Sequence, residues 1–110
     1  MIVTPGSNVA GHRVRRTLGL VRGNTIRARH LGKDILAGLK NLIGGEIQEY
    51  TKMMGEAREQ AIDRMVAEAE SVGANAILDV RFSTSYLMGA AAEILVFGNA
   101  VVIERSDGAG

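Results

Sequence analysis

The chain has no cysteine, and this absence removes three kinds of chemistry. Without thiols there are no disulfide bonds, no thiolate ligands for a metal ion and no cysteine nucleophile. Aromatic side chains are also scarce, since the only ones are Tyr50, Phe82, Tyr86 and Phe97. We therefore expect a core built from Val, Ile, Leu, Met and Ala side chains.

Long apolar runs are missing as well. The most apolar stretch near the C-terminus, "ILVFGNAVVI", has ten residues, whereas a membrane-spanning helix needs about 20. The first residues, "MIVTPGSNVAG", lack the basic start and apolar run of a signal peptide. With 110 residues, of which 46% are hydrophobic, the chain is expected to form one soluble cytoplasmic domain (1–110) with a loose tail at 106–110 and no membrane contact.

Acidic residues are absent from residues 1–33, which carry seven basic ones: Arg13, Arg15, Arg16, Arg22, Arg27, Arg29 and Lys33. Residues 34–110 contain all twelve acids and the other six bases, so the two parts carry +7 and −6. The basic part could bind an anion or a nucleic acid. Alternatively, basic strands pair with an acidic helix, within one chain or between subunits. The second interpretation is favoured because the net charge is only +1, so we expect no nucleic acid as a partner.

The first half of the sequence predicts strands followed by two helices. Residues 14–30 have an extended pattern, in two pieces or as a hairpin, with a turn or bulge at "RGN" (22–24). The spacing of apolar residues predicts a short helix over 34–43, which Gly44 ends, and a longer one over 46–72, which Gly73 ends. Gly55 inside the longer helix would permit a close backbone approach.

The second half predicts two strands. In the first, alternation places Ala76, Leu78, Val80, Phe82, Thr84 and Tyr86 on one face. The last strand, "ILVFGNAVVIER", is apolar on both faces, and Gly98 suggests a bulge or a tight contact within it. Such a strand needs a cover beyond the helices, and in a small domain another subunit is the economical candidate. The expected fold is α+β: a mostly antiparallel sheet with two helices on one face, in the order strands-helix-helix-strand-strand.

Three blocks of the sequence resemble the YbjQ-like proteins, a family of unknown function that is often labelled heavy-metal-binding. They are "RTLGLVRGNTIRARHLGKDILAGLKNLIGG", "GGEIQEYTKMMGEAREQAIDRMVAEAESVGANAI" and "FGNAVVIE", in which Asn99 replaces a Thr of the family pattern. The resemblance implies a homo-oligomer, typically a pentameric ring, whose strands meet around a central barrel. The chain departs from the family after Val80, where "RFSTSYLMGAAAE" is neutral and rich in hydroxyl groups.

Metal binding has little support within one chain. Heavy metals prefer Cys and His ligands, and the candidates are His12 and His30, both flanked by arginines. An oligomer could bring one histidine from each subunit together, so a divalent heavy metal bound on oligomerisation is the alternative function. The acidic stripe Glu49, Glu56 and Asp63 could hold a hard cation, but a solvated helix face explains it more simply. No other cofactor is indicated.

A ligand site could form where the two predicted helices meet. Gly44 and Gly45 precede a helix start, whose free N–H groups can bind an anion; Tyr50 and Arg58 complete the candidates. A plain helix–helix corner, with Tyr50 packed beneath it, is the simpler interpretation. Ser83, Thr84 and Ser85 have no histidine nearby in the sequence, so we expect no enzyme. The expected function is a structural or small-ligand-binding ring.

Overall fold

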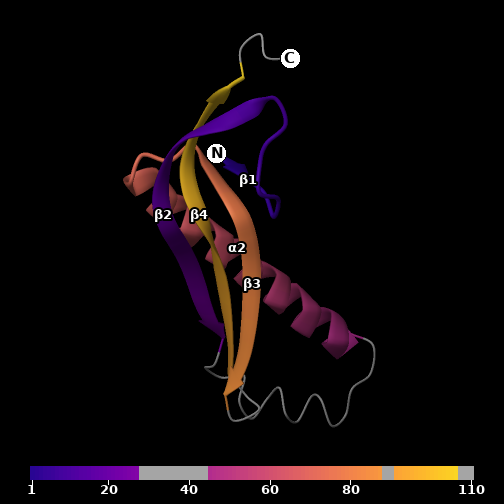
Figure 1. Cartoon of the computed structure of the whole chain (residues 1–110). Coiled ribbons are helices and arrows are strands. Elements are labelled where there is room, and N and C mark those ends of the chain that lie inside the picture. The colour runs from indigo at the N-terminus through magenta and orange to yellow at the C-terminus, as the bar shows by residue number, and fades with distance from the viewer. Residues whose placement is uncertain (28–44, 88–90, 107–110) are drawn as a thin grey trace.

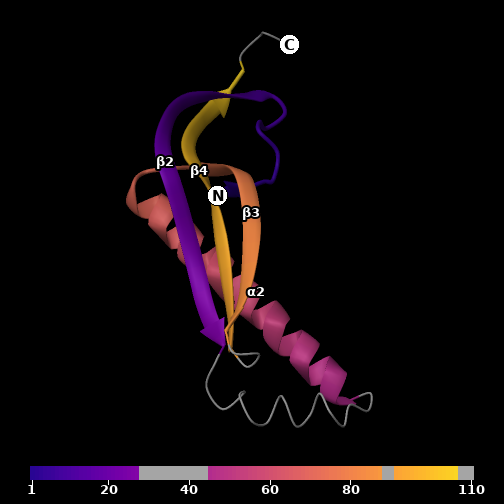
Figure 2. The same cartoon turned by 60° about the horizontal axis from the view of Figure 1, so that its bottom comes forward.

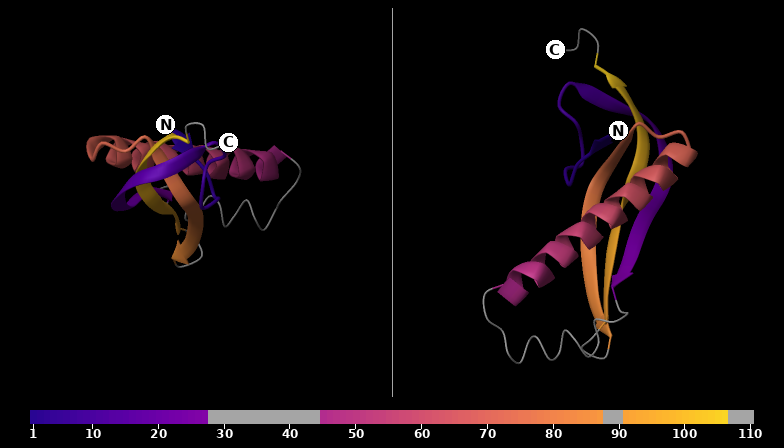
Figure 3. Two further views of the ribbon diagram at one scale, coloured as in Figure 1. Left: turned by 45° about the horizontal axis from the view of Figure 1, so that its top comes forward. Right: turned by 180° about the vertical axis from the view of Figure 1, so that it is seen from behind.

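The fold is a four-stranded sheet with one long helix across one face (Figure 1). The computed structural model describes residues 1–27, 45–87 and 91–106. Its elements are β1 (Ile2–Val3), β2 (His12–Arg27), α2 (Gly45–Ser71), β3 (Ala76–Leu87) and β4 (Ala91–Arg105). The strand order is β1-β3-β4-β2, so the last strand lies at the centre. Seen from behind, α2 runs diagonally over the strands (Figure 3), and it is the one helix of the described residues.

The α+β class is confirmed, but the predicted arrangement of two helices on a mostly antiparallel sheet is wrong. The sheet is mixed, because β1 pairs in parallel with β3 while β2 and β3 both pair antiparallel with β4. The described residues contain one helix, in the order β-β-α-β-β. The helix predicted over 34–43 lies outside the described residues. β1 was missed because two residues are too few to show an alternating pattern.

β2 is one continuous strand of 16 residues and not the predicted pair of pieces or hairpin. Gly23, expected in a turn or bulge, pairs in regular register with Val96. The irregularities lie earlier, between Val14 and Arg16 and between Thr17 and Gly19, where Gly19 has a φ of 113°. Glycine adopts this backbone conformation without steric cost, which allows an extra residue to be accommodated there.

Gly23 has another purpose, because α2 lies directly on it. A Cβ atom at position 23 would lie 2.1 Å from the carbonyl oxygen of Ala61 and 2.5 Å from the amide nitrogen of Met65. Small side chains on the helix allow the same approach, since Ala57 and Ala61 are fully buried. Next to this contact, the hydroxyl of Thr25 donates a hydrogen bond of 3.0 Å to the carbonyl of Ala57. The helix and the strand therefore meet backbone to backbone.

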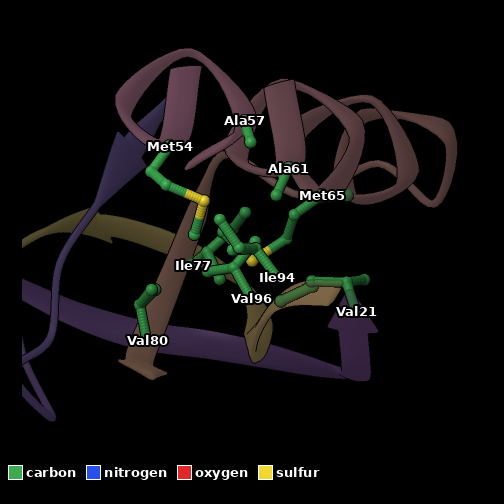
Figure 4. Packing of buried hydrophobic residues seen from close by; sticks show 11 residues of the cluster. Val21, Met54, Ala57, Ala61, Met65, Ile77, Val80, Ile94 and Val96 are labelled. Carbon is green, nitrogen blue, oxygen red and sulfur yellow. The ribbon is translucent and has the colours of Figure 1, made fainter. Parts of the chain in front are cut away.

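The core between α2 and the sheet is aliphatic, as predicted. Its largest fully buried side chains are Met65, Ile77, Ile94 and Val96, which interdigitate beneath the helix (Figure 4). Phe82, in contrast, is 48% exposed. Branched aliphatic and methionine side chains fill the narrow space that a close helix leaves better than rigid rings would.

The helix ends at the predicted glycine. Gly73 has a φ of 86°, its amide donates to the carbonyl of Glu70, and the amide of Ala74 donates to the carbonyl of Ala69. These two bonds are the Schellman pattern of a helix C-terminus. Asn75 then binds the backbone of β4 through two hydrogen bonds. Its side chain donates to the carbonyl of Ile103 at 2.9 Å and accepts from the amide of Ile103 at 2.8 Å. The start of β3 is thereby fixed against β4.

A bulge in β3 decides which side chains face the helix. Asp79 has a φ of 54°, and two residues of β3 oppose Gly98 of β4. The extra residue shifts the alternation, so Ile77 and Val80 lie beneath α2, whereas Ala76 and Leu78 pack in a second cluster on the other side. The predicted common face of Ala76, Leu78, Val80, Phe82, Thr84 and Tyr86 is therefore wrong. The tight contact expected at Gly98 is confirmed, since a Cβ there would lie 2.7 Å from Ile77 Cγ2.

The N-terminal segment holds this bulge in place. The carboxylate of Asp79 accepts hydrogen bonds from the hydroxyl of Ser7 at 2.7 Å and from the side-chain amide of Asn99 at 3.3 Å. The backbone amides of Asp79 and Val80 donate to the carbonyls of Gly6 and Thr4. Residues 4–7 thus replace the strand partner that β3 loses after β1 ends.

Replacing Gly23 by Ala should strongly destabilise the protein. The new Cβ meets helix backbone, which cannot rotate away, so α2 has to lift from the sheet. We expect the free energy of unfolding to fall by about 3 kcal/mol or more, measured by urea unfolding at fixed protein concentration. The control is Gly55→Ala, whose Cβ would meet only Arg58 Nη2 at 3.8 Å and should stabilise the helix by up to about 1 kcal/mol. Equal stability of Gly23→Ala and the wild type would contradict the close contact.

Asp79 should tolerate Asn but not Val. Asn adopts positive φ readily and keeps a side-chain acceptor, so Asp79→Asn should change the free energy of unfolding by less than about 1 kcal/mol. Val is β-branched and cannot make either hydrogen bond, so Asp79→Val should lose about 3 kcal/mol. Limited proteolysis should also cut the segment before His12 faster in Asp79→Val. Unchanged stability and unchanged cleavage of this variant would show that the bulge does not depend on Asp79.

Candidate functional site on the uncovered face of the sheet

The face of the sheet opposite α2 is the candidate functional site. Residues paired across neighbouring strands point to the same side. Val21 and Thr25 are buried beneath the helix, so the residues that alternate with them in β2 point the other way, together with their partners in β4 and β3. This uncovered face is defined here by Leu20, Arg22, Ile26, Arg81, Leu95 and Phe97.

The N-terminal segment covers only one end of this side of the sheet. Val9 packs against the second buried cluster: Ala76, Leu78, Val101 and Ile103. Figure 2 shows β2 arching over at that end, beside the N-terminal segment. Further along the strands, no described residue lies over the sheet on this side.

Apolar side chains remain accessible on the uncovered face. Leu20 is 63% exposed and Ile26 is 57% exposed. On the central strand, Ile94 and Val96 are buried beneath α2, whereas Leu95 and Phe97 on the opposite side stay partly exposed. The strand that is apolar on both faces is therefore sealed by the described residues on one face only.

Polar groups surround these apolar side chains. Arg22 and Arg81 are the cross-strand neighbours of Phe97 on its two sides. The guanidinium of Arg81 is held by the carbonyls of Pro5 and Val80, both at 2.9 Å, and Asn24 donates to Glu93 at 3.2 Å. Arg22 is exposed and has no ion pair among the described residues. An apolar centre with a polar rim is typical of a surface that binds another protein.

The sheet also has two open edges. β2 is an edge strand along its whole length, with β4 as its partner. β3 pairs with β1 only at Ala76 and Ile77, so from Arg81 onward its outer edge has no strand beside it in the described part of the chain. Unpaired edges present free N–H and C=O groups that can pair with another chain.

The residues predicted from the sequence as sites are not gathered in one place. Gly44 and His30 lie outside the described residues. Gly45 is the first residue of α2, and Tyr50 and Arg58 follow in the same helix, separated by about 12 Å along its axis. Arg58 is exposed. His12 begins β2 at the end of the sheet opposite to the start of α2 (Figure 1).

Within a single chain, residues 1–27, 45–87 and 91–106 do not provide a set of ligands for a heavy metal. They contain no group of three or more His, Asp or Glu side chains placed to hold a metal ion. One ring nitrogen of His12, Nδ1, lies 2.9 Å from the carbonyl of Ala10. This leaves Nε2 as the one ring nitrogen of His12 that could coordinate a metal ion. From the predicted acidic stripe, Glu56 and Asp63 are exposed on α2. They line a shallow depression on the helix together with Lys52, Gly55, Glu59 and Gln60.

Sequence reasoning missed the polar cluster of Ser7, Asp79 and Asn99. Ser7 and Asn99 lie 72 and 20 residues from Asp79, so no local pattern connects them. The available signal was Asp79 itself, because aspartate is enriched among non-glycine residues with positive φ. The cluster is structural, since each contact fixes the N-terminal segment or the bulge.

Among the described helices, none combines the length and the apolar character needed to cross a membrane. α2 has 27 residues, and charged side chains are exposed along it from Lys52 to Glu70.

Comparison with known proteins gives relatives over nearly the whole chain. A UPF0145 protein of Dehalococcoides mccartyi is 60% identical over 104 residues, which cover 94% of this chain and 100% of the relative. A UPF0145 protein of Methanosarcina acetivorans is 54% identical, over 94% of this chain and 97% of the relative. A crystal structure of a DUF74-family protein of unknown function from Pediococcus pentosaceus has a TM-score of 0.63 at 16% identity, and the match covers 94% of this chain and 98% of that one.

The structural match supports the fold alone, because its sequence identity is low. The family assignment comes from the sequence. A family model described as "Putative heavy-metal-binding" matches residues 1–104, and the relatives above are at least 54% identical to this chain. The chain therefore belongs to the YbjQ-like, or UPF0145, family, whose function is uncharacterised.

Proposed function

We propose that this protein is a non-enzymatic homo-oligomer, a structural or small-ligand-binding assembly of the cytoplasm whose subunits cover each other's sheets. The family resemblance favours a ring of five copies. The observation that carries the proposal is the uncovered face, where Leu20 is 63% and Ile26 57% exposed beside the partly exposed Leu95 and Phe97. Contiguous exposed apolar side chains on a sheet favour burial against another surface.

The open edges support a ring in particular. The outer edge of β2 and the outer edge of β3 after Arg81 lie on opposite sides of the sheet. If one edge of a subunit pairs with the other edge of its neighbour, the contact is head to tail, and such contacts close into rings when the rotation permits. Closure would also remove the unpaired strand edges that otherwise lead to aggregation.

The proposal of a non-enzyme is supported by the side chains available for chemistry. Ser83 and Ser85 on β3 are exposed, and no histidine is paired with either in the described residues. General acid–base catalysis needs a titrating group within hydrogen-bond reach of the reacting atom. The apolar centre of the uncovered face suits a protein surface or an apolar ligand better than a reaction.

Leu20→Glu should weaken the assembly. The substitution places a carboxylate on the proposed contact surface, where desolvation of the charge opposes association. We expect native mass spectrometry to give an oligomer for the wild type and mostly monomer for Leu20→Glu. Val72→Glu is the matched control, because Val72 is 49% exposed but follows α2, away from the uncovered face. An oligomer that survives Leu20→Glu unchanged would exclude this face as the contact.

Heavy-metal binding on oligomerisation is the second candidate. It is favoured by the description of the family model that matches residues 1–104. The free Nε2 of His12, repeated in each subunit, would supply one donor per copy, and His30 could supply another.

This candidate predicts that the oligomer retains Zn²⁺ or Cd²⁺ in a fixed ratio to its subunits after dialysis. His12→Ala and His30→Ala should each be compared with the wild type by native mass spectrometry. Loss of the metal in either variant, with the oligomer intact, would identify a histidine ligand. Absence of retained metal in the wild-type oligomer would rule this candidate out.

A further inference from the structure

Two surfaces of opposite charge lie far apart on the same chain. The first is an acidic ridge on α2, formed by Glu56, Glu59 and Asp63, with one base, Lys52, beside it. These residues are spaced three and four apart, so they share one side of the helix. All three are exposed, whereas Ala57, Ala61 and Met65 on the opposite side are buried against the sheet. The ridge therefore points directly away from the sheet.

The second surface is a basic end of the sheet, formed by Arg15, Arg16 and Arg105. Arg105 pairs with His12 at the start of β2, and Arg15 and Arg16 lie at the first irregularity of the same strand. All three side chains are exposed. The nearby Arg13 differs, because its charge is already satisfied by Glu104 at 2.8 Å.

Neither surface can neutralise the other within one chain. Ala57 is fixed beside Thr25 by a hydrogen bond, and Arg16 lies nine residues earlier in the same strand. At about 3.3 Å per strand residue, about 30 Å of strand separates the level of Ala57 from the basic end. This separation is several times the Debye length of about 8 Å at physiological salt. Accordingly, Arg13–Glu104 is the one ion pair among the described residues.

We infer that the outer side of α2 is a docking surface for the basic end of a second copy of this chain. Every copy carries one surface of each sign, and the net charge of +1 leaves little excess for a different charged partner. A nucleic acid could match only the basic end and would leave the ridge without an oppositely charged partner. The inference rests on the proposed assembly and adds a further contact between copies, in which the ridge of one copy meets the basic end of another.

Charge reversal tests this docking. One variant carries Glu56→Lys, Glu59→Lys and Asp63→Lys, a second carries Arg15→Glu, Arg16→Glu and Arg105→Glu, and a third combines all six changes. Lysine and glutamate are both good helix formers, so α2 should persist in the first variant, as circular dichroism would verify. Glu68→Lys is the control, because it reverses an exposed charge of α2 outside the ridge.

Sedimentation equilibrium should give an association constant that is at least about tenfold lower in each of the first two variants, because three attractive charge pairs become repulsive. The variant with all six changes should recover most of the wild-type association constant. An equimolar mixture of the first two variants should also assemble. Raising the salt from 50 to 500 mM should weaken the wild-type assembly without any substitution.

Three results would overturn the inference while leaving the proposed assembly intact. The first is an oligomer whose association constant does not depend on salt. The second is either reversed variant assembling like the wild type. The third is a variant with all six changes that folds but does not regain the wild-type association constant. Binding of a nucleic acid that is lost with the arginines, while assembly is unchanged, would assign the basic end to that partner instead. A wild-type chain that stays monomeric at every concentration would refute the proposed function itself.

Discussion

The close contact between α2 and β2 is the constraint on which the rest of the structure depends. At Gly23 the helix backbone lies where a Cβ atom would be, and small helix residues make the same approach from the other side. A helix this close covers one face of the sheet with a thin aliphatic layer, and the margin of that face, at Phe82, stays exposed. One helix covers one face of the sheet only. On the other face, the described residues cover the central strand β4 only in part. The apolar side chains of β4 on that side are the reason to expect a partner.

Much of the fold could be predicted from the sequence, because some signals are local. The periodicity of α2, its end at Gly73 and the aliphatic core follow from residue types and spacing. The bulge at Asp79 could not be predicted, since it depends on Ser7, Gly6 and Asn99, which are distant in the sequence. One extra residue reversed the alternation of β3. The parallel strand β1 is too short to show a pattern, and its place is set by hydrogen bonds at the start of β3.

The candidate site was predicted only in outline. A last strand that is apolar on both faces pointed to a second sheet face in need of a cover, and the described residues cover that face only in part. The sequence could not show which residues join it there, because the role of Leu20, Ile26 and Phe97 depends on cross-strand register. Gly23 shows the same limit: its type suggested a turn, but its reason is a helix from elsewhere in the chain. The uneven charge was visible at once, while the distance between its two surfaces required the fold.

The central claim is that the uncovered face is buried by another copy, and a single tryptophan at position 20 tests it most directly. The chain has no tryptophan of its own, so Leu20→Trp gives one fluorescent probe on this face. At concentrations where sedimentation finds the oligomer, the emission should be shifted to shorter wavelength and protected from acrylamide, in contrast to a Val72→Trp reference. On dissociation, the shift and the protection should disappear together. Emission and quenching equal to those of the reference in the intact oligomer would contradict the account.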